Sequence, residues 1–236
     1  IINSAYLYDN LTVKLVSANE SDKRQAAQID QFVKEGVDLL IISPNKNNTI
    51  TPAIERAYDK GIPVVLLDRK INSNKYTAYI GADNVNVGRE LGRYLAQKTG
   101  GKARIVEILG LPGSSSSAER HQGFVEALQA YPGMKIVQQR YGDWQPKSAR
   151  LCMDSVLKSG VDFDCVFSHN DRMAIAARNV VEERGIKRPI TYIGVDGLPV
   201  PGGGVDNVRD GRLEASYIYP ARGDLVIQLA MTILNH

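Results

Sequence analysis

Polar residues that can bind hydroxyl groups follow several apolar runs of this chain, at the point where each run ends. Three such junctions occur: Leu67-Asp68-Arg69, Phe167-Ser168-His169-Asn170 and Val195-Asp196. In an open α/β sheet, ligands bind in the crevice beyond the carboxyl ends of the strands. A carboxylate accepts hydrogen bonds and a guanidinium donates several in one plane, so Asp68 and Arg69 together can bind neighbouring hydroxyls of a polyol. The pattern predicts a cleft for a small molecule.

Each candidate residue also has an ordinary structural interpretation. Asp68 and Arg69 can form a salt bridge at a strand end. Asn170 can cap a helix, and Asp196-Gly197 can form a turn. Trp144, the only tryptophan, follows a predicted strand and can either fill a core or stack on the face of a sugar. A binding site requires that these residues meet at one edge of a sheet, which is where the strand ends place them.

The sequence contains no specific catalytic, nucleotide-binding or metal-binding motif. Residues 110–117 precede a predicted helix and resemble a phosphate-binding loop, but they lack a Gly-Lys-Ser/Thr ending and a G-x-G-x-x-G pattern. The three histidines, His121, His169 and His236, do not have the spacing of metal ligands. No serine or cysteine lies in a reactive motif. We therefore expect a protein that is not an enzyme and that needs no metal or cofactor.

Charge and cysteine content narrow the possible partners. The formal net charge of +3 is spread along the chain without a basic arm, which argues against direct binding of nucleic acid. The apolar runs are much shorter than the roughly 20 residues that a transmembrane helix needs. Cys152 and Cys165 lie among apolar residues, which is typical of buried free thiols, although a disulfide between them stays open.

Strands and amphipathic helices alternate along the chain at intervals of roughly 30 residues, as βαβ units require. We expect strands at residues 13–16, 37–43, 62–67, 103–109, 135–139, around 166–167, 190–196 and 213–219. We expect helices at residues 25–35, from a Thr51-Pro52 start to Gly61, at 86–98, 118–130, 147–158 and 173–184, shortly before Gly211, and at 224–234. Residues 37–43 form a continuous apolar run, which indicates a strand buried on both faces of a parallel sheet.

The number of these units decides between two α/β architectures. There are too many for one sheet of ordinary width, which favours two doubly wound parallel-sheet lobes. An eight-stranded α/β barrel is the alternative, but it needs about eight regular strand–helix units in about 250 residues. We count fewer regular strand–helix units than this in the chain, which favours the two-lobed architecture over the barrel.

Five segments, in this order along the chain, resemble the type I periplasmic sugar-binding proteins, of which ribose-binding protein is the best known. They are VVLLDR at 64–69, IGADN at 80–84, ERHQGF at 119–124, SHNDRMA at 168–174 and GVD at 194–196. The resemblance covers essentially the whole chain. It implies an N-terminal lobe of residues 1–82 plus 220–236 and a C-terminal lobe of residues 83–219, joined by a hinge near Ala82-Asp83 and Tyr219-Pro220.

A narrower resemblance is to the periplasmic sensor domains of Bacteroides-type hybrid two-component systems, a subgroup that includes a fructose sensor. It is carried by GVDLLIIS at 36–43, YTAYIGADN at 76–84 and IYP at 218–220. It implies a periplasmic domain fused, beyond its C-terminus, to a membrane span and a histidine kinase, and signalling as a homodimer.

The family's ligand contacts, carried over by position, fall on seven residues: Asp68, Arg69, Arg120, Trp144, Asn170, Asp196 and Tyr219. The resemblance implies that Trp144 stacks on the sugar ring and that the others bind its hydroxyls. Tyr219 takes the position where many relatives carry Gln. Relatives begin with a further strand and helix, and residues 1–8 resemble part of that helix, so we expect the first strand to be missing.

We therefore interpret the chain as a sensor domain that closes around a small neutral sugar, such as fructose or a pentose, because the ligand favours the closed state. One alternative is a free sugar-binding protein of an ABC transporter. Another is the effector domain of a lactose-repressor-type regulator, which would need a helix-turn-helix before Ile1. An enzyme acting on sugars is the third. The identity of the sugar stays open.

Overall fold

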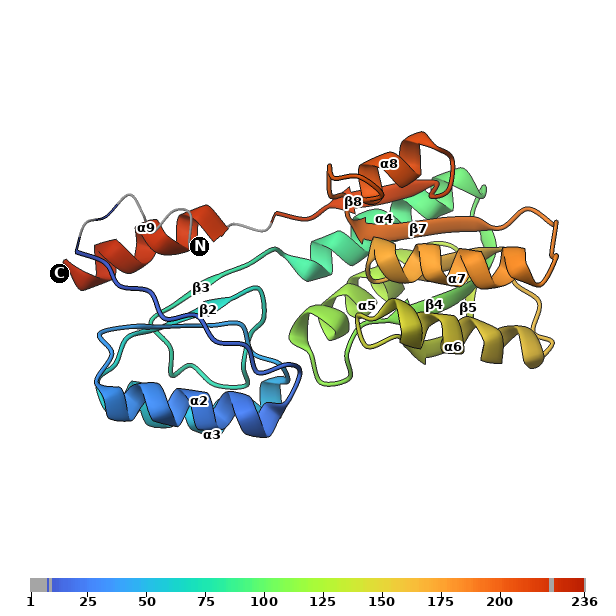
Figure 1. Cartoon of the computed structure of the whole chain (residues 1–236). Coiled ribbons are helices and arrows are strands. Elements are labelled where there is room, and N and C mark those ends of the chain that lie inside the picture. The colour runs from blue at the N-terminus through green and yellow to red at the C-terminus, as the bar shows by residue number, and fades with distance from the viewer. Residues whose placement is uncertain (1–7, 9, 221–222, 236) are drawn as a thin grey trace. The chain divides into compact units, whose positions relative to one another are not determined.

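The computed structural model describes Tyr8 and residues 10–220 and 223–235. It forms two compact units (Figure 1). The first comprises residues 1–82, 113–115 and 221–236, and the second comprises residues 83–112 and 116–220. The expectation for residues 1–8 lies, apart from Tyr8, outside the described residues.

The first unit is built on a three-stranded parallel sheet in the order β1-β2-β3. Its strands are β1 (Leu40–Ile42), β2 (Val64–Leu67) and β3 (Ala78–Ile80), and its helices are α2 (Asp22–Glu35), α3 (Asn47–Asp59) and α9 (Gly223–Leu234). Successive residues of a strand face opposite sides of a sheet. Val64 and Leu66 pack in the core that contains α2 and α3, whereas Val65 packs against α9. The sheet is therefore covered on both faces.

The second unit contains a five-stranded parallel sheet in the order β5-β4-β6-β7-β8. Its strands are β4 (Lys102–Leu109), β5 (Gly133–Tyr141), β6 (Cys165–Ser168), β7 (Thr191–Asp196) and β8 (Ala215–Ile218). Its helices are α4 (Asn84–Lys98), α5 (Ser115–Leu128), α6 (Pro146–Lys158), α7 (Asp171–Glu183) and α8 (Gly204–Arg209). Ile105 faces the core with α4 and α5, and Val106 faces the core with α6 and α7. This sheet is doubly wound as well.

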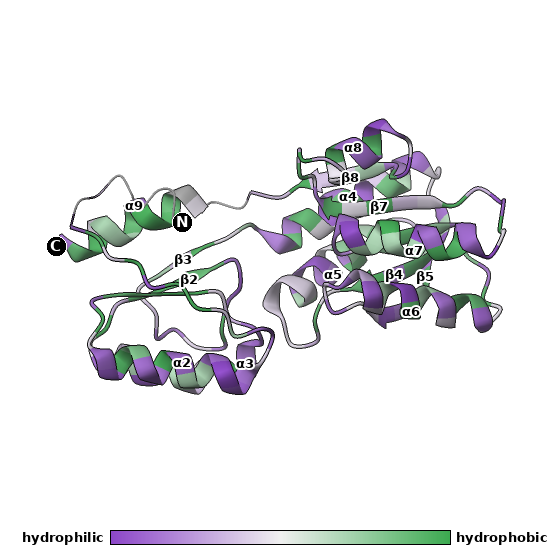
Figure 2. Cartoon of the chain, viewed as in Figure 1, coloured by the Kyte–Doolittle hydropathy of each residue, from purple (hydrophilic) through white to green (hydrophobic). Residues whose placement is uncertain are grey.

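The helices are amphipathic because only one side of each meets a sheet. Figure 2 shows hydrophilic and hydrophobic residues together on the outer helices α2, α6 and α7. In the core beneath α4 and α5, the rings of Phe124 and Phe167 stack with their centroids 4.3 Å apart, and both side chains are fully buried. Burial of one such side chain contributes about 1.5–3 kcal/mol.

Two predictions about local structure are wrong. Residues 13–16 are not a strand, and Leu15 is 67% exposed because no described strand pairs with this segment. Helix α3 begins at Asn47 rather than at a Thr51 cap. Ile50 and Ile54, one turn apart, are both fully buried, and this packing outweighs the hydrogen bond lost at Pro52.

Strand β3 was not expected, because its three residues are too few to show an apolar pattern. Cys152 and Cys165 are free thiols, and Cys152 is only half-buried. Within the described ranges, no helix has both the length and the apolar character needed to cross a membrane.

Candidate ligand-binding site

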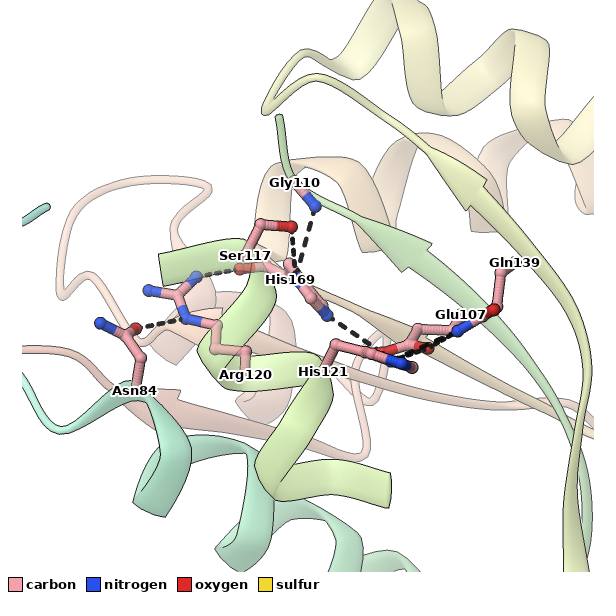
Figure 3. A network of polar contacts seen from close by, with 8 residues as sticks. All are labelled: Asn84, Glu107, Gly110, Ser117, Arg120, His121, Gln139 and His169. Atoms are coloured by element: carbon pink, nitrogen blue, oxygen red, sulfur yellow. Dashed lines mark hydrogen bonds and ion pairs between the residues drawn. The ribbon is translucent and has the colours of Figure 1, made fainter. Parts of the chain in front are cut away.

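Arg120 is a predicted site residue that several hydrogen bonds and ring contacts anchor (Figure 3). It lies on α5 and is only 4% exposed. Its Nε donates to Asn84 Oδ1 at 2.8 Å, and a terminal nitrogen donates to the main-chain oxygen of His169 at 2.5 Å. A buried charge is costly unless it is hydrogen-bonded. These two neutral acceptors therefore hold the guanidinium in one orientation without cancelling its charge.

Two aromatic rings flank this guanidinium. Its carbon lies 5.4 Å from the ring centroid of Trp144 and 4.7 Å from that of Tyr219. Such cation–π contacts contribute about 0.5–2 kcal/mol each. Asn84 Nδ2 also donates to the Tyr219 hydroxyl at 3.3 Å. The structure thus brings Arg120, Trp144 and Tyr219 together around one charge.

The close crossing of α4 and α5 is what lets Asn84 reach Arg120. A Cβ atom on Gly88 would lie 2.0 Å from the main-chain oxygen of Arg120, and one on Gly123 would lie 1.8 Å from that of Val85. Only glycine allows the two helix backbones to approach this closely. Asn84, the first residue of α4, is therefore in hydrogen-bonding distance of a side chain on α5.

Trp144 is positioned by a tight turn after β5. Asp143 and Trp144 both have left-handed backbone conformations, with φ of 53° and 62°, which non-glycine residues rarely adopt. The indole lies against Gly110, where an added Cβ would come within 2.1 Å of ring atom Cζ2. Gly110, the first residue of the loop that resembles a phosphate-binding loop, thus provides the surface on which the tryptophan rests.

Asn170 caps a helix, one of the two roles that its sequence position left open. Its Oδ1 accepts from the main-chain nitrogen of Met173 at 2.8 Å, at the start of α7. Its Nδ2 donates to the main-chain oxygen of Trp144 over a longer 3.4 Å. The cap fixes the direction of the amide, so the capping role and a ligand-binding role are compatible.

Asp196 ends β7 in a strained turn that a neighbouring carboxylate holds. Its φ is 120° and that of Gly197 is 57°. Asp171 Oδ2 accepts from Gly197 N and from Ser216 Oγ, both at 2.8 Å. Burial raises the pKa of Asp171 to about 7, and the charge of Asp196 adds to this effect. A cavity of about 290 Å³ in the second unit is lined by Asp171, Asp196 and Asn207, among others.

Asp68 and Arg69 form a separate pair on the first unit. Asp68 follows β2 with a φ of 67°, and its main-chain nitrogen donates to Ile80 at 2.8 Å. Arg69 donates to the main-chain oxygens of Pro44 and Asn45 at 3.3 and 3.1 Å. The Arg69 Nε to Asp68 Oδ2 distance is 3.7 Å, a loose ion pair that leaves the Asp68 side chain 37% exposed.

Sequence reasoning missed three groups that hold the second-unit residues: Asn84, Asp171 and the pair Glu107–His169. Asn84 and Asp171 lie inside segments that carried the family resemblance, but nothing in the segments indicated what they contact. Glu107 did carry a signal, because a carboxylate between Val106 and Ile108 interrupts an apolar strand. Across the residues that the structure describes, no group of His, Cys, Asp and Glu side chains could hold a metal ion.

Residues 4–236 match the protein family described as "Periplasmic binding protein domain". The chain belongs to this family. The ribose import binding protein of Bacillus subtilis (strain 168) is 30% identical over 227 residues, which are 95% of this chain and 72% of that protein. The galactofuranose-binding protein of Escherichia coli (strain K12) is 32% identical over 198 residues, 80% of this chain and 62% of the other.

Solved structures of this periplasmic binding protein family share the fold. The fructose-binding periplasmic domain of a hybrid two-component system superposes with a TM-score of 0.96 at 44% identity, covering 99% of this chain and 78% of the other. The binding protein of an arabinose ABC transporter from Shewanella sp. ANA-3, bound to L-arabinofuranose, gives 0.90 at 28% identity, covering 99% and 79%. The resemblance and the α/β fold class predicted from the sequence are confirmed. The relatives named here are binding proteins or a sensor domain rather than enzymes.

Proposed function

We propose that this chain is a periplasmic domain that binds a small neutral sugar, with fructose as the first candidate, and passes the binding event to a signalling protein of which it is part. The observation that carries the proposal is the Arg120 cluster. A guanidinium is held buried by neutral acceptors between two aromatic rings, so its direction is set before any ligand arrives.

The charges of the proposed site suit a neutral ligand. The second unit contributes Arg120 and Asp196, and the first contributes Arg69 and Asp68. One cation and one anion from each unit cancel formally, so hydroxyls that both donate and accept are better matched than a sugar acid. Charge-assisted hydrogen bonds of this kind contribute about 1.5–3 kcal/mol each. Trp144 offers an aromatic face for the apolar side of a sugar ring.

Closure would follow from contacts made by both units. In this proposal, residues 1–82 with 220–236 and residues 83–219 act as lobes, with hinge segments near Ala82-Asp83 and Tyr219-Pro220. A ligand shifts such an equilibrium only by its greater affinity for the closed state. Residues from both units, Asp68 and Arg69 together with Arg120, Trp144, Asn170, Asp196 and Tyr219, would supply that difference.

The sensor role is supported by the 44% identity to the periplasmic domain of a hybrid two-component system, in which the domain is one part of a longer protein. A fused membrane span, a histidine kinase and a dimeric arrangement belong to this part of the proposal. The transport role is the second candidate, because the Bacillus subtilis relative is an import binding protein. Fructose-dependent phosphorylation by the full-length gene product would separate the two.

Titration calorimetry of the purified domain tests the binding proposal. The ligands are fructose, a set of pentoses and hexoses, and sugar acids as a charged comparison. Saturable binding of one neutral sugar, lost in Arg120→Met, supports the proposal. A ligand present at about 1,000 times its Kd should also stabilise the fold by about 4 kcal/mol in a thermal melt. Absence of binding to every saccharide, or a preference for sugar acids, would overturn it.

A further inference from the structure

A carboxylate that no proposed ligand contact uses, that of Glu107, lies fully buried on the far side of His169 from Arg120 (Figure 3). Glu107 is on β4 and faces the side of the sheet that α5 covers. Its Oε1 lies 3.1 Å from His169 Nε2. Its Oε2 lies 2.9 Å from His121 Nδ1 and accepts from Gln139 Nε2 at 2.8 Å. Both oxygens of the carboxylate therefore have partners, from α5, from β5 and from the loop between β6 and α7.

The hydrogen bonds around His169 define where its proton lies. The main-chain nitrogen of Gly110 donates to Nδ1 at 3.3 Å, so Nδ1 is an acceptor and Nε2 carries the proton that faces Glu107. Burial lowers the pKa of His169, which keeps the ring neutral. Burial alone would raise the pKa of Glu107, but the hydrogen bonds from His121 and His169 outweigh it and lower that pKa to about 2.

The two histidines adjoin the residues proposed to bind ligand. His121 directly follows Arg120 on α5, and His169 directly precedes Asn170. The main-chain oxygen of His169 is itself one of the two acceptors for Arg120. The His169 ring also lies 6.3 Å from the Trp144 ring, measured between centroids. One carboxylate thus ties together the two chain segments that present Arg120 and Asn170.

Stability alone is a poor reason for a buried charge here. Replacing buried ion pairs with packed apolar residues is often neutral or stabilising, because desolvating the charges costs about as much as their attraction returns. The neighbours Ile105, Val106 and Ile108 are all fully buried apolar residues, so an apolar side chain would suit this strand. What an apolar residue cannot do is fix the rotation of two imidazole rings at once.

We propose that Glu107 is a positioning residue that acts through His169 and His121 to hold Arg120 and Asn170 in the orientation that receives the ligand. The inference rests on the proposed sugar-binding function, and it adds a determinant of affinity that does not touch the sugar. Outer-shell partners of this kind change affinity by roughly 10–100-fold in metal sites.

The test compares Glu107→Met with Glu107→Gln in the purified domain, with sugar affinity measured by calorimetry. The Met variant removes both acceptors and should weaken binding at least about tenfold. The Gln variant keeps an acceptor for His169 and should recover part of the loss. Trp144 is the only tryptophan, so its emission reports on the site directly and should shift in the Met variant before any sugar is added.

Ile54→Ala is the control, because Ile54 is fully buried in the core that contains α2 and α3, and that core does not include Trp144. It should lower Tm while leaving affinity and Trp144 emission unchanged. His121→Leu, at a half-buried position, removes one arm of the network and keeps the test open if the Met variant does not fold. It should weaken binding severalfold.

Two failures are distinguishable. If the wild-type domain binds no saccharide, the proposed function is wrong and the inference falls with it. If the wild type binds but the folded Glu107 and His121 variants bind equally well, with unchanged Trp144 emission, the positioning role alone is overturned.

Discussion

The two arginines proposed to bind ligand are held in different ways. Arg69, on the first unit, is anchored by the main-chain oxygens of a neighbouring loop, and its side chain is 20% exposed beside a loose Asp68 partner. Arg120, on the second unit, is buried among side chains from several elements. We expect the first arrangement to adjust more readily than the second, in which any movement of Arg120 disturbs side chains of several elements. The second unit therefore supplies the rigid part of the proposed site.

Arg120→Met should cause the largest loss. It removes charge-assisted hydrogen bonds to the ligand and leaves Asn84 Oδ1 without its donor, so we expect affinity to fall by about 3 kcal/mol or more, over a hundredfold. Calorimetry with the bound sugar measures this. The exposed Arg93→Met is the control and should bind like the wild type. If Arg120→Met lowers affinity no more than Arg69→Met does, the second unit does not supply the more rigid part of the site.

Asp171 gives the second unit a pH-dependent stability. Its pKa is raised from 3.8 to about 7, mainly by burial, so the folded state holds this proton more tightly than the unfolded chain. The resulting stabilisation is complete below about pH 4 and is lost as pH rises to 7, a change of at most about 4 kcal/mol. Unfolding of the wild type and of Asp171→Asn, compared from pH 4 to 8, should diverge over this window. If the free energies of unfolding of the two proteins change in parallel with pH, the raised pKa of Asp171 is wrong.

Asp68→Asn tests the first unit's contribution to the proposed site. It keeps the shape of a partly exposed residue and removes one charged acceptor, so we expect an affinity loss of about 1.5–3 kcal/mol with little change in Tm. Asp59→Asn, on the surface of the same unit, should leave affinity unchanged. A marked fall in Tm would show that Asp68 belongs to the rigid framework after all.

Gly110→Ala should have the smallest effect. The added methyl group displaces the Trp144 ring, and overpacking of this kind costs about 1–3 kcal/mol of stability. Affinity should fall less than in Arg120→Met, because the guanidinium keeps its hydrogen bonds. Tryptophan emission of the free domain is the measurement, and an unchanged spectrum would mean that the ring does not rest on Gly110.

Apart from residues 13–16 and β3, the order of strands and helices could be predicted from apolar periodicity, and the family from motifs such as SHNDRMA at 168–174. The predicted helix boundaries were wrong where tertiary packing determines them. The burial of Ile50, for example, lets α3 begin at Asn47, before the expected Thr51 cap. Arg120 and Tyr219 were named by resemblance. Their shared contact with Asn84 could not be predicted, because Asn84 is separated from them in the sequence by 36 and 135 positions respectively. The contacts of Glu107 could not be predicted either. Its position within an apolar run indicates a buried charge, but the sequence does not show which residues bind it. The ligand roles of all seven site residues stay predictions.

The glycine crossing of α4 and α5 has a consequence for how this domain tolerates mutation. Gly88 and Gly123 lie on helix surfaces that face each other, and neither is among the residues proposed to touch a ligand. Any larger side chain at either position would still push the helices apart and separate Asn84 from Arg120. A screen for mutants that no longer respond to sugar should therefore return substitutions at these two glycines as well as at the binding residues. Functional variants should accept few other residues at Gly88 and Gly123, although neither position is proposed to contact the sugar.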